Sequence, residues 1–282
     1  MKSILKRLTP PLILDVYRKI FNAQFKSKEA GVQNNWSGNY SSWNEALKNT
    51  SGYDDQRILE KCRTALLKVK NGEAKYERDS VLFDEIEYSW PLLATLQRSA
   101  LENNNKLTVL DFGGSLGSTY FQNKGSLSNN IDLSWHIVEQ KIFVDEGKKH
   151  FEDDSLKFFY TIEESMKQKR ADVVILSSVL QYLEHPHEML SDILSLRAPY
   201  IVIDLTTFIE TDSDILTIQT VPESIYKASY PAWFFSLARF KDQLLNYEII
   251  SEFNVHEGLV ISLDNGVKAS YKGFILKLKE EK

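Results

Sequence analysis

The chain has 282 residues, a formal net charge of −5, 43% hydrophobic residues and 26% charged residues. These proportions are those of an ordinary globular protein, and the acidic balance gives no electrostatic case for binding nucleic acid. Cys62 is the sole cysteine, which excludes an internal disulfide and a cysteine-built zinc site and favours a reducing compartment such as the cytoplasm.

The first 28 residues are basic, with apolar residues between the charges. Asp15 is the only acid among these cations: Lys2, Lys6, Arg7, Arg18, Lys19, Lys26 and Lys28. The pattern is typical of an amphipathic helix, which either docks on the protein itself or lies on an anionic membrane surface. No run approaches the ~20 apolar residues that a membrane span needs, and a signal peptide's apolar core is missing. Peripheral contact of residues 1–28 with the inner membrane face is therefore a hypothesis beside the docked helix.

Residues 1–105 favour helices, and we expect them to form a helical extension or lid. Aromatic residues gather in Trp36–Trp43, a pattern more typical of a structural anchor than of a ligand site. Apolar residues recur at helical spacing over 55–70, and a further helix fits 88–102.

From residue 106 onward, apolar strand-like runs alternate with helical patterns. We expect strands over 107–111, 134–139, 156–160, 171–177 and 199–204, and helices over 117–124, 141–152, 162–168 and 186–195. This alternation predicts a parallel, doubly wound α/β sheet. Two more strands, 247–253 and 270–278, would close it as an antiparallel pair. Residues 106–282 are thus expected to form one domain with a Rossmann-like sheet of seven strands.

A long polar-to-aromatic insert, 206–235, follows the fifth expected strand. Loops at this edge of such a sheet commonly select the substrate. Its aromatic residues, Tyr230 to Phe235, would either stack on a sugar ring or bury a lid against the core.

A glycine-rich turn is the most informative local pattern. An apolar strand runs into Asp111 and then into Gly113, Gly114 and Gly117. Glycines let the backbone approach a ligand, and the helix start behind them offers free N–H groups. In dinucleotide sites the acid comes about twenty residues after the glycines, so an NAD-linked oxidoreductase is disfavoured. Ser115 stands where the middle glycine of an acid-x-Gly-x-Gly-x-Gly loop would be.

A second acid, Glu139, ends the next expected strand. A carboxylate there can accept hydrogen bonds from two donors at once. Farther along, Ser177 and Ser178 end the strand 171–177 and would lie at the carboxyl edge of the sheet, where such folds bind ligands.

These residues resemble class I S-adenosylmethionine-dependent methyltransferases over roughly residues 106–278. The resemblance implies that the glycine-rich loop, with Ser115, passes close to the methionine part of the cofactor, and that Asp111 lies near its ammonium, directly or through the loop. It implies that Glu139, followed by Gln140, accepts hydrogen bonds from both ribose hydroxyls. The acid that often lies near the adenine is replaced by Tyr160 and Thr161.

The segment from Ser177 to Pro186 resembles the strand-to-helix run of many small-molecule methyltransferases. In those enzymes a histidine facing the substrate often stands where this chain has Tyr182. Tyr182 could orient an acceptor hydroxyl or take part in proton transfer, or it packs under the loop. His185 is the second candidate base. The spacing of His185 and His187 is more typical of surface residues than of metal ligands, so no metal is expected.

A narrower resemblance covers most of the chain. It is to a bacterial family of methyltransferases encoded among surface-polysaccharide (O-antigen) genes, and rests on Trp36–Tyr40, Ser51–Asp54, Tyr76–Ser80, Asp111–Ser118, Val138–Gln140 and Leu176–Tyr182. It implies S-adenosylmethionine as cofactor and a small molecule or glycan precursor as acceptor, in the cytoplasm. The alternative is a catalytically silent binding module that keeps the scaffold, because Ser115 and the missing adenine acid depart from the pattern.

Overall fold

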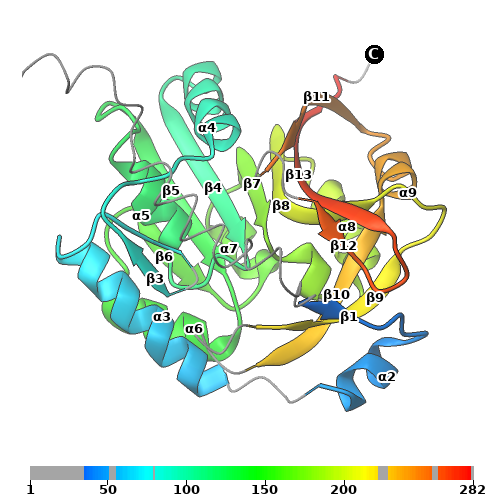
Figure 1. The fold of residues 1–282 in the computed structure, drawn as a ribbon. Coiled ribbons are helices and arrows are strands. Elements are labelled where there is room, and N and C mark those ends of the chain that lie inside the picture. Colours follow the sequence, from blue (N-terminus) through cyan, green and yellow to red (C-terminus); the bar gives the residue numbers. More distant parts are fainter. Residues whose placement is uncertain (1–34, 51–54, 79, 222–227, 256–259, 281–282) are drawn as a thin grey trace, which may run out of the picture. The chain divides into compact units, whose positions relative to one another are not determined.

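The computed structural model describes residues 35–50, 55–78, 80–221, 228–255 and 260–280 (Figure 1). Residues 1–28, and with them the hypothesis of membrane contact, lie outside the described residues. Residues 36–282 form one compact unit. In the described part of this unit, no helix combines the length and the apolar character needed to cross a membrane.

The main sheet has eleven strands within the described residues, and seven of them form its core. These seven are β4 (Lys106–Phe112), β5 (Asp132–Val138), β6 (Leu156–Phe159), β7 (Val173–Ser177), β8 (Tyr200–Ile209), β11 (Tyr247–Asn254) and β13 (Lys268–Leu278). Their order is β6-β5-β4-β7-β8-β13-β11, with β4 to β8 parallel and β13 antiparallel to both β8 and β11. The predicted doubly wound sheet closed by an antiparallel pair is confirmed.

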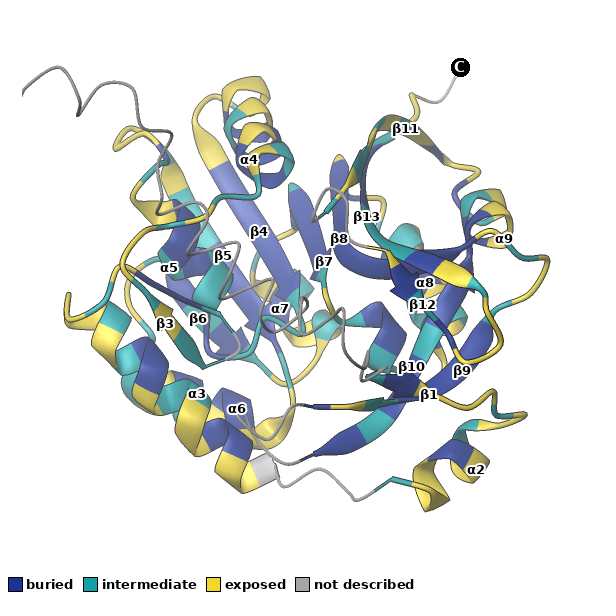
Figure 2. Ribbon diagram, viewed as in Figure 1, coloured by how far each residue is buried: buried dark blue, intermediate teal, exposed yellow. Residues whose placement is uncertain are grey.

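Helices cover both faces of this core. One face carries α3 (Asp55–Lys70), α4 (Trp90–Glu102), α5 (Ser118–Lys124) and α6 (Lys141–His150), and the other carries α7 (Ile162–Gln168), α8 (Pro186–Ser195) and α9 (Leu237–Asp242). Because side chains alternate along a strand, Val109 packs with the first group and its neighbour Leu110 with the second. In Figure 2 the central strands are buried, while α3 keeps an exposed outer side.

Local sequence explains where these helices begin. Thr161 caps α7 by accepting a hydrogen bond from the Glu164 backbone N–H at 3.2 Å, and Pro91 stands in the first turn of α4. The burial of Ile58, Leu59 and Leu66 on one side of α3 matches the predicted amphipathic helix.

The described residues among the first hundred include short strands as well as the predicted helices. Besides α2 (Trp43–Lys48), α3 and α4, they contain β1 (Trp36–Ser37), β2 (Tyr76–Arg78) and β3 (Val81–Phe83). Strands β2 and β3 pair with each other, and β1 joins the main sheet through β9 (Ile215–Thr220). Strands of two or three residues are too short to show a period of two, so the sequence pattern could not reveal them.

The predicted loop over 206–235 is wrong, because most of the segment is strand. Strand β8 continues to Ile209, and β9 and β10 (Ser229–Ser236) form an antiparallel pair (Figure 1). Strand β13 occupies one edge of β8 along its whole length, while β7 pairs with the other edge as far as Asp204 and β10 pairs there from Phe208. Buried apolar residues on β9 and β10 hold this extension in the sheet rather than leaving it as a loop.

Candidate functional site

The glycine-rich loop leaves β4 at the carboxyl edge of the parallel strands. The Gly113 N–H donates to the Val138 carbonyl at 2.9 Å, and Gly113 has a φ of +74°. Ser115 has a φ of +52° and Gly117, directly before α5, a φ of +108°. Ser115 therefore keeps the left-handed backbone that a glycine would adopt, so its departure from the motif preserves the course of the loop.

Close packing leaves no room for side chains at the first two glycines. A Cβ at Gly113 would lie 2.5 Å from Val179 Cγ2, and one at Gly114 would lie 2.6 Å from the Asp111 carboxyl carbon. The loop is thus packed against both the segment after β7 and the acid beneath it.

Asp111 lies beneath the loop and is 1% exposed. Its Oδ2 accepts a hydrogen bond from Trp135 Nε1 at 3.1 Å. Burial raises the pKa of Asp111 to about 7, the Trp135 hydrogen bond opposes this rise, and the charge of Glu139 adds to it. The structure therefore places Asp111 directly under the backbone of Gly114.

Glu139 lies at the end of β5, beside the loop. Its Oε2 accepts the Gln140 backbone N–H at 2.5 Å, and the Ser115 backbone N–H is a second donor. Burial raises its pKa, and these two N–H groups oppose the rise. A carboxylate has about four acceptor positions, so Glu139 can accept further hydrogen bonds. The side chain of Gln140, directly before α6, is exposed.

Tyr160 follows β6 but turns toward α6. Its hydroxyl donates to Asp145 Oδ1 at 2.7 Å, and Lys141 and Lys148 lie over its ring. The side chain is 39% exposed. The structure thus places Tyr160 near the end of β5, where the Glu139 N–H donates to the Phe159 carbonyl, with its hydroxyl engaged by α6.

Ser177 and Ser178 lie where β7 ends, next to β8. Ser177 pairs with Asp204 of β8, and the Ser178 N–H donates to the Asp204 carbonyl at 3.0 Å. Ser178 has a φ of +54°. Chain exits from β4 and β7 therefore both use a left-handed serine at the same edge of the sheet.

Tyr182 belongs to the single 3-10 turn η2 (Leu180–Tyr182). Its hydroxyl donates to Gln219 Oε1 of β9 at 2.9 Å, and its ring meets Tyr230 of β10 edge to face, with centroids 5.2 Å apart. The hydroxyl and the ring of this candidate residue therefore both contact the β9–β10 extension.

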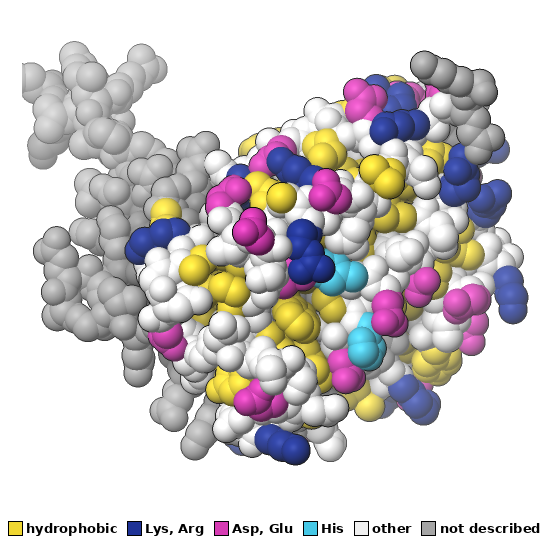
Figure 3. All heavy atoms as spheres, turned by 90° about the vertical axis from the view of Figure 1, so that its right-hand side faces the viewer, with side chains coloured by type: hydrophobic (Ala, Val, Ile, Leu, Met, Phe, Trp, Pro, Cys, Tyr) yellow, Lys and Arg dark blue, Asp and Glu magenta, His cyan; other side chains and the backbone are white. Residues whose placement is uncertain are grey.

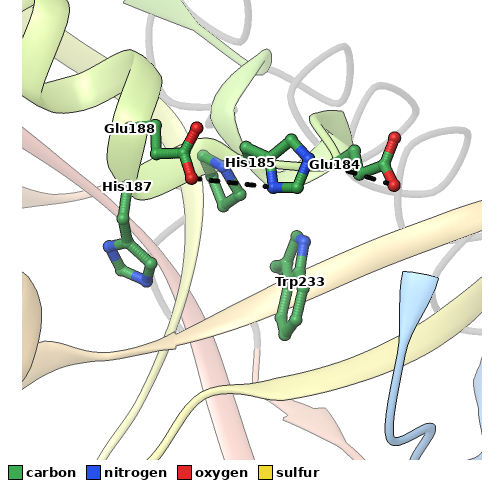
Figure 4. Close-up of a pocket in the computed structure, with 6 residues that line it drawn as sticks. Glu184, His185, His187, Glu188 and Trp233 are labelled. Carbon is green, nitrogen blue, oxygen red and sulfur yellow. Dashed lines mark ion pairs between the residues drawn. The ribbon is translucent and has the colours of Figure 1, made fainter.

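His185 lies in a different place, at a small cavity of about 170 Å³ (Figure 4). Its ring nitrogens lie 4.0 Å from Glu184 and from Glu188, and its side chain is 66% exposed. His187 and Trp233 also line the cavity. The structure therefore does not bring the two candidate bases together: His185 lines this cavity, and Tyr182 is not among its lining residues.

His187 is held more firmly than His185. Its Nε2 lies 2.7 Å from Asp214 Oδ2, and its Nδ1 contacts Gln243. The Asp214 hydrogen bond raises the pKa of His187 against the effect of burial. On this side of the molecule, histidine side chains lie among acidic ones (Figure 3).

Within the described ranges, no group of three or more potential ligands is placed to hold a metal ion.

Two buried acids near the site were not predicted. Glu77 of β2 is 4% exposed and accepts hydrogen bonds from the Ser118 hydroxyl and from the Ser80 N–H, the latter at 3.1 Å. It thus ties β2 to the helix that follows the glycine-rich loop. Asp204 is 3% exposed, and burial raises its pKa. Asp204 ends an apolar run already expected as a strand, whereas the burial of Glu77 depends on the contact between β2 and α5.

No family model matches the chain, and no curated protein matches it. Among solved structures, Burkholderia thailandensis 1,6-didemethyltoxoflavin-N1-methyltransferase with bound 1,6-didemethyltoxoflavin and S-adenosylhomocysteine is 12% identical. It covers 81% of this chain and 92% of that chain, with a TM-score of 0.38.

Two further solved structures are similar at the same level. An S-adenosylmethionine-dependent methyltransferase from Clostridium acetobutylicum is 10% identical, covers 78% of this chain and 99% of that chain, and has a TM-score of 0.44. An amino pentose methyltransferase from Micromonospora echinaspora with S-adenosylmethionine bound is 8% identical, covers 68% of this chain and 92% of that chain, and has a TM-score of 0.42.

Proposed function

We propose that this protein is an S-adenosylmethionine-dependent methyltransferase that acts on a small molecule or a glycan precursor. The observation that carries the proposal is the contact between the glycine-rich loop and the Glu139 carboxylate. There the Ser115 backbone N–H donates to a carboxylate at the end of β5, in a loop whose backbone is left-handed at Gly113, Ser115 and Gly117.

These residues fit the cofactor chemically. Glu139 keeps acceptor capacity for the two ribose hydroxyls, because its known donors are two backbone N–H groups. Gly113 and Gly114 let the loop pack closely on Val179 and Asp111, which fixes the course of the backbone that the methionine part would approach. Gln140, Tyr160, Ser177 and Ser178 follow the neighbouring strands at the same edge and complete the proposed cofactor site.

The bound cofactor would supply an electrophilic methyl group on a sulfonium. The protein's main task is then to hold donor and acceptor in line, which can contribute much of the rate. We assign the acceptor to the side of the edge formed by η2. Tyr182, whose hydroxyl donates to Gln219, is the candidate that would orient an acceptor hydroxyl or take part in proton transfer. His185 remains the second candidate base.

Calorimetry with S-adenosylmethionine and S-adenosylhomocysteine tests the proposal. Both should bind, and Glu139→Ala should weaken binding by about 1–3 kcal/mol because the ribose donors lose their partner. Glu188→Ala is the matched control, since the Glu188 side chain is 80% exposed at the other wall, and should bind as the unmodified protein does. If neither S-adenosylmethionine nor S-adenosylhomocysteine binds at millimolar concentration, the proposal is refuted. Binding without methyl transfer to any acceptor would favour the silent binding module.

The wider context is part of the same proposal. The sequence resemblance supports a role in surface-polysaccharide biosynthesis in the cytoplasm, with residues 1–105 as an extension or lid on the domain 106–282. The basic composition of residues 1–28 supports contact with the inner membrane face. Sedimentation with anionic liposomes, with and without residues 1–28, tests the contact, and equal partitioning of the two forms would rule it out.

A further inference from the structure

Three residues connect the exits of β7 and β8 at the carboxyl edge, and we call Leu205, Gln181 and Ser178 the Ser178 network. Gln181 of η2 is 1% exposed, and its Nε2 donates to the Leu205 carbonyl at 3.0 Å and to Ser178 Oγ at 3.4 Å. A carbonyl oxygen can only accept, so the nitrogen of the Gln181 amide must face Leu205. The direction of the amide is thereby fixed, and with it the donor that reaches Ser178.

The Ser178 network contains features that ordinary packing does not require. Among the described residues, the buried Oε1 of Gln181 has no hydrogen-bond partner, which is costly. Ser178 and Leu205 both have a left-handed backbone, with φ of +54° and +50°. Unpaired buried polar groups and left-handed non-glycine residues are more typical of functional sites than of ordinary cores. These features therefore indicate a role toward a ligand.

Ser178 is the exposed end of this network. Its N–H donates to the Asp204 carbonyl at 3.0 Å, so its backbone is held while its side chain stays accessible. Within the described ranges, that side chain makes one hydrogen bond, in which Oγ accepts from Gln181. Because the oxygen accepts there, the hydroxyl proton is left to donate to a ligand.

Ser178 adjoins the glycine-rich loop through the next residue. Val179 packs against the loop so closely that a Cβ on Gly113 would lie 2.5 Å from its Cγ2. Three of the loop's own N–H groups already donate within the protein, namely those of Gly113, Ser115 and Gly117. A donor from the neighbouring segment therefore matters for an anionic group that lies beside the loop.

Two acids near the Ser178 network carry less charge than their number suggests. Burial raises the pKa of Asp204, and a hydrogen bond from Ser89 and the positive charge of Arg78 oppose the rise. An aspartate with an arginine beside it has little net charge. Burial raises the pKa of Asp111 to about 7, so near neutral pH it is only partly ionised. An anionic group at Ser178 is therefore less strongly repelled than two full charges would imply.

We propose that the Ser178 hydroxyl donates a hydrogen bond to the carboxylate of the cofactor's methionine part, and that Gln181 is the positioning residue that orients this hydroxyl. Ionised Asp111 and Glu139 offer only acceptors, which suits an ammonium and ribose hydroxyls but not a carboxylate. The inference rests on the proposed function and deepens it, because it assigns a separate donor to one group of the cofactor.

Calorimetry with two nucleosides tests the inference. S-adenosylhomocysteine has the carboxylate, whereas S-adenosyl-3-thiopropylamine keeps the amine and lacks only the carboxylate. Ser178→Gly removes the hydroxyl and suits the φ of +54°, so urea unfolding should show little loss of stability. It should weaken binding of S-adenosylhomocysteine about tenfold or more, as expected for a lost hydrogen bond to a charged group. Binding of the thiopropylamine should change less than about threefold, because it has no carboxylate for the hydroxyl to meet.

A double-mutant cycle separates positioning by Gln181 from a structural role. Gln181→Leu should weaken S-adenosylhomocysteine binding about three- to tenfold, because the Ser178 hydroxyl loses its orientation. It should have no further effect on affinity when Ser178→Gly is already present. Gln97→Leu on α4 is the matched control, since its amide donates to the Ser126 carbonyl at 2.9 Å, and should leave the affinity unchanged.

Gln181→Glu is the second variant if Gln181→Leu fails to fold. Its carboxyl group can donate at most once, to Leu205, so Ser178 again lacks its donor and the same results are expected. The inference is overturned if Ser178→Gly binds S-adenosylhomocysteine as the unmodified protein does, if it weakens both nucleosides alike, or if the substitutions at 178 and 181 add in the cycle. If S-adenosylhomocysteine does not bind the unmodified protein, the proposed function fails and the inference fails with it, whereas binding that is indifferent to Ser178 overturns the inference alone.

Discussion

The two ends of the carboxyl edge are built in different ways. At the β4–β5 end, Asp111, Gly113 and Ser115 are near neighbours in sequence, and Glu139 follows the next strand. At the β8–β10 end, Gln219 and Tyr230 are paired across β9 and β10, and Tyr182 reaches them from η2 through a hydrogen bond and a ring contact.

The two ends therefore differ in how strongly the fold restricts the residue types that they can contain. The β4–β5 end imposes backbone conformations and close packing on a contiguous segment, so few residue types fit there. The β8–β10 end imposes only burial and pairing, so its exposed side chains can change with little effect on the rest of the sheet. Perturbing one end should therefore leave the other largely intact.

The largest expected effect is at the β8–β10 end. Trp36 of β1 is 5% exposed and packs edge to face on Phe234. Trp36→Ala should lower the free energy of unfolding by about 3–5 kcal/mol, the range for truncating a buried aromatic residue. Affinity for S-adenosylhomocysteine in calorimetry should change less than threefold.

Trp90→Ala is the control for this experiment, because Trp90 is 68% exposed. In urea unfolding it should cost well under 1 kcal/mol. A loss of nucleoside affinity in Trp36→Ala that matches its loss of stability would show that the two ends are one cooperative site.

The next effect tests the buried acid at the β4–β5 end. The pKa of Asp111 is raised from 3.8 to about 7, so the folded protein holds a proton between these pH values that the unfolded chain releases. Its contribution to stability should therefore fall as pH rises from about 4 to about 7 and be constant above. At 1.36 kcal/mol per pKa unit, roughly 4 kcal/mol is the upper bound.

Asp111→Asn removes this proton linkage while keeping the shape of the side chain. The difference in unfolding free energy between the unmodified protein and Asp111→Asn, measured by urea titration without nucleoside at pH 4 to 8, should follow that slope. A difference that is flat with pH would mean that Asp111 is ionised throughout.

A smaller effect tests the close packing of the loop. Gly113→Ala places a Cβ 2.5 Å from Val179 Cγ2 and forces a left-handed alanine, which together should cost about 2–4 kcal/mol. Gly72→Ala isolates the backbone part, because Gly72 has a φ of +78° with nothing within 4 Å, and should cost about 1 kcal/mol. Equal costs in urea unfolding would show that Val179 moves aside freely.

The smallest effect concerns the ion pair between His187 of α8 and Asp214, which directly precedes β9. Asp214 raises the pKa of His187 above its ordinary value of 6.5, so their stabilisation is complete below that value and is lost as pH rises through the pKa of the folded state. Because the pair is partly exposed, His187→Gln should cost no more than about 1 kcal/mol at pH 5.5 and less at pH 8.5. Urea unfolding at the two pH values measures this, and a larger cost at pH 8.5 would contradict it.

Much of the core could be predicted because its signals are local. The helices 55–70, 162–168 and 186–195 match α3, α7 and α8 to the residue, since apolar residues at helical spacing, the Thr161 cap of α7 and Pro186 at the start of α8 are local signals. The central strands match within a few residues for the same reason. The apolar run of β7 is buried on both faces, as predicted for a central strand.

The remainder depended on contacts that no local pattern encodes. Strands β9 and β10 were predicted as loop because polar residues interrupt their apolar ones, and their pairing with β8 and β1 becomes visible only in the sheet. The same limit applies to the site. Tyr182 was singled out from its segment, but its partner Gln219 carries no signal in the sequence, and the left-handed backbone of Ser115 is concealed by its side chain.

The pairing of β1 with β9 has a consequence for how the chain folds. Trp36 pairs with Gln219, so the earliest described strand finds its neighbour only after most of the chain has been made. Contacts this distant along a chain form late and slow the overall rate. During synthesis, β1 with its Trp36 side chain can pair only after β9 has been made, whereas the β4–β5 end can assemble earlier.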